Sequence, residues 1–239
     1  MAQQFYVLKS SPVGSRWETD CFDLDNSITG PAPTCPVCGN YIGKLTWLPP
    51  LQVELKLWGD ALPDVLFAPG DDRLVSERFR DLYLAAGLTG LEGFDPVEIV
   101  RIIARKKKSK PKPGKYFRTT VVLSRTRVDQ EASGCIWKKA PTCNWCRVGN
   151  ITGWQRIVIS EDSWTGEDIF RPSGLYGVII ATSRFYEFCK LHCISGVLLI
   201  PSEKCWHPPY GPQLYSDAWE CGAKSVKRLD SEQLAHFEY

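Results

Sequence analysis

The sequence lacks several features that would assign it at once to a common class of protein. In its 239 residues no uninterrupted apolar run approaches the ~20 residues that a membrane-spanning helix needs. Its start, MAQQFYVLKSSPVGSRW, has no basic segment followed by the long apolar segment of an export signal. We therefore expect a cytoplasmic protein that does not associate with a membrane.

The sequence is also poor in the residues and motifs of catalysis. It has only three histidines, His192, His207 and His236, and none has the spacing of a metalloprotease motif. The nucleophile-elbow, P-loop and dinucleotide-binding motifs are absent. Cys205 lies two residues before His207, but side chains at this interval diverge on a strand, so an enzyme based on Cys205 has the least support. We predict no catalytic residues.

Net charge is small, because 29 Lys and Arg residues balance 27 Asp and Glu residues and leave a formal charge of +2. The balance conceals a strong segregation along the chain. Residues 1–100 carry a net charge of −7, residues 101–130 carry +10 and residues 131–239 carry −1. Any partner of this protein therefore meets an uneven electrostatic field.

Cysteine, by contrast, is plentiful: there are ten, and four of them form two C-x-x-C pairs. The first pair is Cys35 and Cys38 in PTCPVCGN, and the second is Cys143 and Cys146 in PTCNWCRV. In a C-x-x-C turn the two thiolates converge on one side, so two turns supply the four corners of a tetrahedral zinc site. We predict one structural Zn²⁺ bound by these four side chains, in a reducing compartment.

Other interpretations of the cysteine pairs stay open. The pairs are separated by 104 residues, far more than in an ordinary zinc ribbon, so local disulfides or free thiols are one alternative. A thioredoxin-type redox pair fits less well, because neither pair lies between a clear strand and the start of a helix. If zinc is bound, four protein ligands leave no position for water, which indicates a structural and not a catalytic metal.

A similar block of sequence follows each cysteine pair. RLVSERFRDLYLAAGLTGLEGF, residues 73–94, aligns without a gap with IIATSRFYEFCKLHCISGVLLI, residues 179–200. In each block Ser76 or Thr182 precedes apolar residues at helical spacing, which predicts a capped helix. A glycine then ends the helix and leads into a short apolar strand. The equivalent glycines are Gly90 and Gly196. Chance similarity between two amphipathic helices is the alternative.

These patterns predict an α+β protein of two similar halves, each a mainly antiparallel sheet with one helix, joined by a shared zinc knuckle site. With 44% hydrophobic residues the chain has material for a buried core. We expect a first half at 1–104, a basic hinge or hairpin loop at 105–118, and a second half with an aromatic tail at 119–239, within what can be one compact domain. The expected strands are 5–9, 51–58, 96–103, 117–128, 154–160, 175–181 and 196–202.

The expected hinge carries much of the positive charge. Its lysines without interleaved aromatic residues favour a solvated loop over a specific nucleic-acid arm, and we expect its loss to leave the main function intact. The lysines are Lys106, Lys107, Lys108, Lys110, Lys112 and Lys115. A zinc-ribbon protein that binds nucleic acid through this segment is the alternative function.

Taken together, the turns CPVCG and CNWCR and the blocks VSERFRDLYLAAGLTGLEGF and IIATSRFYEFCKLHCISGVLL resemble the double-CXXCG motif proteins, a family of myxobacterial paralogues. The resemblance extends from Trp17 to about Ile200, and it departs once, where Arg147 replaces the glycine after the second pair. Members of the family are described as immunity proteins of polymorphic toxin systems. The resemblance implies a non-catalytic protein that binds and neutralises one cognate toxin domain in the cytoplasm.

An immunity protein needs a rigid scaffold and a complementary surface. Acidic side chains of the first half are the candidates for such a surface, because they can mimic phosphates against a basic nuclease toxin. The candidate toxin-binding residues are Asp20, Asp23, Asp25, Asp60, Asp64, Asp71 and Asp72. The oligomeric state is not specified by the sequence.

Overall fold

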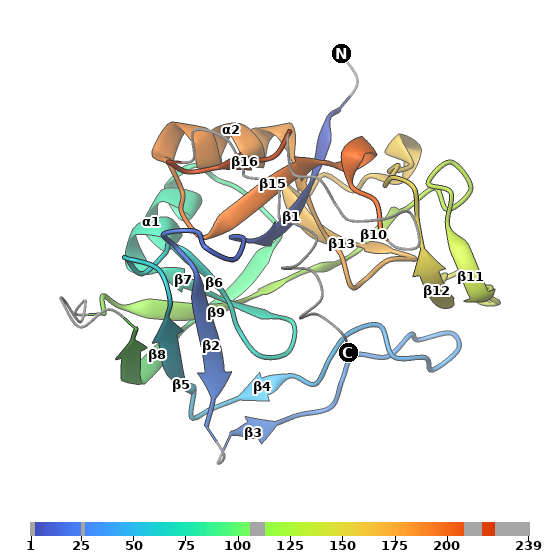
Figure 1. The fold of residues 1–239 in the computed structure, drawn as a ribbon. Helices are drawn as coiled ribbons and strands as arrows, with labels where there is room; N and C mark the ends of the chain where they lie inside the picture. The colour runs from blue at the N-terminus through green and yellow to red at the C-terminus, as the bar shows by residue number, and fades with distance from the viewer. Residues whose placement is uncertain (1–2, 25–26, 106–112, 208–216, 223–239) are drawn as a thin grey trace.

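The computed structural model of the chain describes residues 3–24, 27–105, 113–207 and 217–222 (Figure 1). Two α-helices and two six-stranded sheets dominate this part of the protein, which confirms the predicted α+β class. Neither helix in the described ranges is long and apolar enough to cross a membrane. Both large sheets are mainly antiparallel, and each contains one parallel pair of strands.

The first large sheet takes one strand, β2, from before the first cysteine pair and its other five strands from between the two pairs. The strand β5 alternates buried and half-buried residues, with Val53, Leu55 and Leu57 facing the core, as expected for a half-buried strand. The long strand β8 pairs with β9 through its first half and with β5 through its second. In spatial order the strands are β2 (Thr19–Asp23), β5 (Gln52–Leu57), β8 (Leu91–Ala104), β9 (Tyr116–Val121), β7 (Asp72–Ser76) and β6 (Val65–Phe67).

The second large sheet contains the first strand of the chain. β1 lies between β14 and β15 and is antiparallel to both. In spatial order the strands are β10 (Leu123–Arg127), β13 (Ile169–Ser173), β14 (Ile179–Thr182), β1 (Phe5–Ser10), β15 (Val197–Pro201) and β16 (Trp219–Glu220). The division of the chain into 1–104 and 119–239 stays a prediction. Strand pairing crosses this division, because β1 from the first segment lies in a sheet whose other strands all come from the second.

The two helices begin where the sequence predicts. Helix α1 (Glu77–Ala85) is capped by Ser76, whose hydroxyl accepts a hydrogen bond from the N–H of Phe79 at 3.1 Å. Helix α2 (Ser183–His192) is capped in the same way by Thr182. α1 packs against β7 and β9, and α2 packs against β14 and β1.

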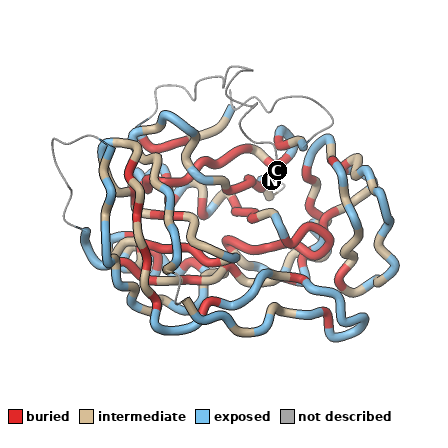
Figure 2. Tube along the Cα trace, turned by 60° about the horizontal axis from the view of Figure 1, so that its bottom comes forward, coloured by how far each residue is buried: buried red, intermediate tan, exposed pale blue. Residues whose placement is uncertain are grey.

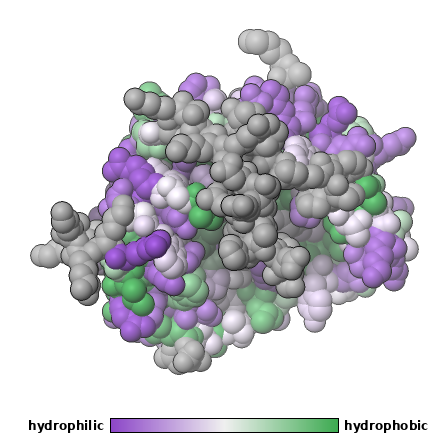
Figure 3. Space-filling model, in the orientation of Figure 1, coloured by the Kyte–Doolittle hydropathy of each residue, from purple (hydrophilic) through white to green (hydrophobic). Residues whose placement is uncertain are grey.

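The largest core cluster is shared by both helices and both sheets. The ring of Phe188 in α2 meets the rings of Phe79 and Tyr83 in α1 edge-on, with centroids 5.9 and 6.4 Å apart. Figure 2 shows the buried residues as long runs in the central strands, with exposed residues on the outer loops. On the face drawn in Figure 3, hydrophilic and hydrophobic side chains are mixed.

The two predicted glycines allow distant segments of the chain to approach closely. Gly90 has a φ of +104°, and a Cβ atom there would lie 1.8 Å from the carbonyl oxygen of Ile169. Gly196 has a φ of +87°, and its Cβ would lie 2.1 Å from the carbonyl oxygen of Val65. Only glycine fits either position, because any side chain would meet backbone atoms.

One expected strand is absent, one forms only at its end and one is divided. Residues 117–128, expected as one strand, form most of β9 and all of β10, which belong to different sheets. Residues 154–160 form no strand, only isolated bridges at Trp154 and Ile159, because their backbone groups bond to loops. Of residues 175–181 only the end is extended, since β14 begins at Ile179 after a turn. The remaining elements are short: β3 (Ile28–Thr29) with β4 (Trp47–Leu48), β11 (Ile136–Lys139) with β12 (Asn150–Gly153), and the 3₁₀ turns Glu161–Ser163 and Ser202–Lys204.

Candidate metal centre

The four cysteines predicted to bind metal lie together. The Sγ atoms of Cys35, Cys38, Cys143 and Cys146 are all within 4.8 Å of one another. Sγ of Cys35 is 3.9 Å from that of Cys143, and Sγ of Cys38 is 3.7 Å from that of Cys146. Zn–S bonds of about 2.3 Å in a tetrahedron separate neighbouring sulfurs by about 3.8 Å, so the spacing fits a tetrahedral metal ion.

Each cysteine turn is closed by a residue in the left-handed conformation. In the first turn, Gly39 has a φ of +74° and donates a hydrogen bond to the carbonyl of Cys35 at 2.9 Å. In the second turn, Arg147 has a φ of +55° and donates to the carbonyl of Cys143 at 2.9 Å. Arg147 therefore takes the backbone conformation that glycine adopts in the first turn, so the second turn closes in the same way as the first.

The side chain of Arg147 offsets the cost of that conformation. Its guanidinium donates to the carbonyl of Val128 at 3.1 Å, and Gln130 donates in return to the carbonyl of Arg147 at 3.0 Å. The hydroxyl of Ser173 at the end of β13 donates to the carbonyls of Trp145 and Cys146. These bonds fix the second turn to the sheet.

The environment of the thiols differs within the second turn. Backbone N–H groups of Cys146 and Trp145 that point at the sulfur lower the pKa of Cys143 to about 7. Burial raises the pKa of Cys146 to about 12, because its side chain is fully enclosed. A bound metal ion would hold both as thiolates.

The chemistry of this donor set identifies the class of metal. Four thiolates in a tetrahedron favour Zn²⁺ or iron over magnesium or calcium, which prefer oxygen ligands. Four protein ligands leave no open position, so the bound ion would hold the two turns together. In Figure 1 the light-blue segment between β3 and β4, which carries the first turn, extends toward the β11–β12 pair that flanks the second.

The predicted acidic surface divides into two groups. Asp20, Asp23 and Asp60 are exposed, and Asp20 accepts a hydrogen bond from the indole of Trp58 at 2.6 Å. Asp25 lies outside the described residues. These exposed positions remain candidates for contact with a partner.

Asp64, Asp71 and Asp72 have partners inside the chain instead. Asp64 accepts from the backbone N–H and the hydroxyl of Ser195 at 3.1 and 2.9 Å. Asp71 pairs with the buried Arg171 at 3.2 Å. Asp72 is only 4% exposed and accepts from Thr120 at 2.6 Å. The structure therefore gives all three a role in the fold, which sequence reasoning missed because their partners are distant along the chain.

The other features that the sequence singled out lie elsewhere. Lys106, Lys107, Lys108, Lys110 and Lys112 fall outside the described residues, and Lys115 pairs with Glu77 at 3.1 Å.

Cys205 and His207 both lie against neighbouring side chains. Cys205 is fully buried, and the ring of His207 is stacked on that of Trp154 with centroids 4.5 Å apart. Both side chains therefore contribute to packing.

One feature of the structure was not predicted. Cys193, just after α2, forms a disulfide with Cys221, just after β16, which ties the last described strand to the helix. The two residues are separated by 28 positions and belong to no C-x-x-C pair, so no spacing signal could identify them.

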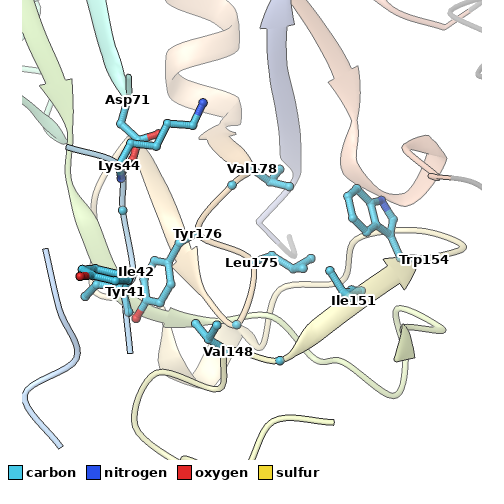
Figure 4. A pocket seen from close by; sticks show the side chains of 14 residues that line it. Tyr41, Ile42, Lys44, Asp71, Val148, Ile151, Trp154, Leu175, Tyr176 and Val178 are labelled. Carbon is cyan, nitrogen blue, oxygen red and sulfur yellow. Dashed lines mark hydrogen bonds between the residues drawn. The ribbon is translucent and has the colours of Figure 1, made fainter. Parts of the chain in front are cut away.

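A pocket of about 370 Å³ lies beside the metal centre (Figure 4). Its lining comes from three segments: residues 41–44 after the first cysteine turn, residues 148–154 after the second, and residues 174–178 between β13 and β14, with Asp71 at one end. We call it the inter-turn groove.

No protein-family model matches the sequence, and no curated protein matches it.

Proposed function

We propose that this chain is a non-catalytic immunity protein that holds one structural Zn²⁺ and neutralises a cognate toxin domain in the cytoplasm. One observation supports the proposal: two cysteine turns, whose corresponding residues are 108 positions apart along the chain, bring four thiols within 4.8 Å of one another. A closed set stabilises a scaffold and offers no site for a substrate. The resemblance of the same turns and helical blocks to double-CXXCG proteins supplies the biological role.

We also propose that the scaffold consists of two similar halves joined at this zinc site. The contacts of Asp64 and Asp168 support the idea. Asp64 bonds to the cap of α1, Ser76, and to Arg78 in its first turn. Asp168 bonds to the cap of α2, Thr182, and to Arg184 in its first turn.

Each of the two aspartates also binds the loop that follows the other helix. Asp64 accepts from the N–H of Ser195, and Asp168 accepts from the N–H of Thr89. Ser195 and Thr89 precede the aligned glycines of the two blocks. Such reciprocal contacts hold the two helical units together and are what a pair of like units would make.

The exposed negative charge of the first half suits a basic protein partner. Of the exposed acidic side chains in the first half, Asp20 and Asp23 make no ion pair within the described residues. A basic toxin domain would approach this half faster at low ionic strength.

The test is neutralisation of the toxin domain encoded by the gene immediately upstream. Co-expression of the chain in a bacterial host should restore growth, and the two purified proteins should form a stable complex. Cys146→Ser should lose both properties, whereas Cys135→Ser, a free cysteine outside the metal centre, should keep them. A zinc-loaded protein that neither binds that domain nor restores growth would contradict the proposal.

Nucleic-acid binding is the competing function. Arg105, which precedes the lysine-rich segment, and Lys56 both lie over the ring of Trp58, at 5.7 and 4.0 Å from its centroid. A salt-dependent shift of DNA or RNA that is lost when the lysines of 105–118 are neutralised would favour it. We expect no such shift, because the two cations cover the ring that would stack on a base.

A further inference from the structure

The inter-turn groove is built so that its walls come from both cysteine turns. Tyr41 and Ile42 follow the first turn closely, and Val148 follows the second. Figure 4 shows Tyr41 and Ile42 beside Tyr176, with Val148 on the neighbouring segment and Trp154 at the other end of the pocket. The distance between these walls depends on the contact between the turns, so the groove is part of the structure that the metal centre holds together.

The lining of the groove is apolar. Val148, Ile151, Leu175 and Val178 contribute aliphatic side chains, and Tyr41 is 72% exposed at the rim. Four glycines also line it, and at Gly177 a Cβ atom would meet no atom within 4 Å. The volume of about 370 Å³ is in the range of sites that accept a ligand, roughly 300–1,000 Å³.

Two charged groups lie at one end of the groove. The ammonium of Lys44 is at the rim and makes no ion pair within the described ranges, whereas the carboxylate of Asp71 is bound to Arg171 and to the backbone N–H of Lys44. The rim therefore has an uncompensated positive charge.

We propose that the inter-turn groove is an anchor site for a protein partner, which inserts a large apolar side chain, aromatic or long aliphatic, next to an acidic residue. The apolar side chain fills the space that the glycines leave, and the acidic residue pairs with Lys44. A buried anchor in a pocket with a polar rim is how a few residues supply most of the affinity of an interface. That the partner is the cognate toxin rests on the proposed function. The kind of side chain that fits the groove is inferred from the groove alone.

A substitution can close the groove without disturbing the fold. Gly177 is exposed, has an ordinary φ and has open space where a Cβ would lie, so Gly177→Phe should place its ring in the groove. Gly114, in the connection between β8 and β9, also has open space and an ordinary φ and does not line the groove. Gly114→Phe is therefore the matched control.

The probes are two blocked dipeptides, N-acetyl-Asp-Trp-amide and N-acetyl-Lys-Trp-amide, titrated into the zinc-loaded full chain and followed by ¹⁵N–¹H NMR. The acidic peptide should shift the amides of Gly149 and Gly177, and the basic one should bind about threefold to fivefold more weakly, as expected for an exposed ion pair. Lys44→Glu should reverse this order, and Lys138→Glu, at another exposed lysine, should not. Gly177→Phe should abolish binding while keeping its zinc and its melting temperature.

Three results would overturn the inference. Saturating peptide could leave these amides unmoved; nuclear Overhauser contacts could show residues 208–216 of the same chain in the groove; or a second copy could occupy it, with a dimer in solution. A further result separates the inference from the proposed function. If Gly177→Phe binds the toxin domain as well as Gly114→Phe does, the groove is not the anchor site although the protein is an immunity protein. If the peptides bind but no toxin does, only the proposed function fails.

Discussion

The guanidinium of Arg184, in the first turn of α2, donates a hydrogen bond to the backbone carbonyl of Ala86, at the carboxyl end of α1, at 2.6 Å. Arg78, in the first turn of α1, donates in turn to the carbonyl of His192 at the end of α2. The last carbonyls of a helix have no partner within it and carry partial negative charge, so each arginine satisfies the end of the other helix. The two helices are therefore coupled through their termini as well as through their aromatic rings.

Asp168 accepts hydrogen bonds both from α2 and from the loop that follows α1. It is 4% exposed and accepts from the N–H of Thr89, the hydroxyl of Thr182 and the guanidinium of Arg184. Asp168→Ala should lower the free energy of unfolding by about 2–4 kcal/mol, because it leaves buried donors without an acceptor. Asp162→Ala, at an exposed salt bridge, should change it by less than about 0.5 kcal/mol. Denaturant unfolding measures both, and equal values would contradict this role.

Gly90 should tolerate no side chain. Gly90→Ala should lower the free energy of unfolding by more than about 3 kcal/mol, because its Cβ would meet the carbonyl of Ile169 and its φ is left-handed. Gly114→Ala should change it by less than about 1 kcal/mol, since nothing surrounds that position. Thermal unfolding followed by circular dichroism distinguishes the two, and a stable Gly90→Ala protein would refute the close approach of Gly90 to Ile169.

The metal centre should contribute directly to stability. Protein purified without added metal should contain one zinc ion per chain by elemental analysis, and Cys146→Ser should lose it while Cys135→Ser keeps it. At a free zinc concentration 1,000 times its dissociation constant, binding raises the free energy of unfolding by about 4 kcal/mol. Chelation should then lower the melting temperature by roughly 8–16 °C for a chain of this size. Disulfides within each C-x-x-C pair in place of zinc would contradict the assignment.

Stability should fall as the solution is acidified below neutrality, in part through His207. Burial, with a contribution from Lys9, lowers the pKa of His207 from its ordinary value of 6.5. Below about pH 6.5 the unfolded chain therefore binds more protons at this group than the folded chain does, and the folded state loses stability. His207→Phe preserves the stack on Trp154 and should make the decline between pH 7 and pH 5 shallower. The free energy of unfolding is measured by urea titration at several pH values. If it declines with pH equally steeply in the two proteins, His207 makes no such contribution.

Local sequence patterns predicted the features that depend on near neighbours. Ser76 and Thr182 cap the helices because a hydroxyl three residues before a free N–H can bond to it. The apolar spacing that follows them identified the buried faces of α1 and α2, and runs such as 5–9 and 196–202 form strands. By contrast, residues 154–160 have a strand-like composition but form no strand, since the partners of their backbone groups lie in loops.

The sequence by itself determined which side chains can bind a metal: four thiols in two C-x-x-C turns, each turn local and self-contained. Only the tertiary structure decided that the turns meet, that β1 joins the sheet of the last strands, and that Cys193 pairs with Cys221. It also decided that Asp64, Asp71 and Asp72 bond within the chain. The physical reason is range: a cap or a turn is set by bonds across a few residues, whereas these contacts join residues far apart and depend on how the sheets and helices pack.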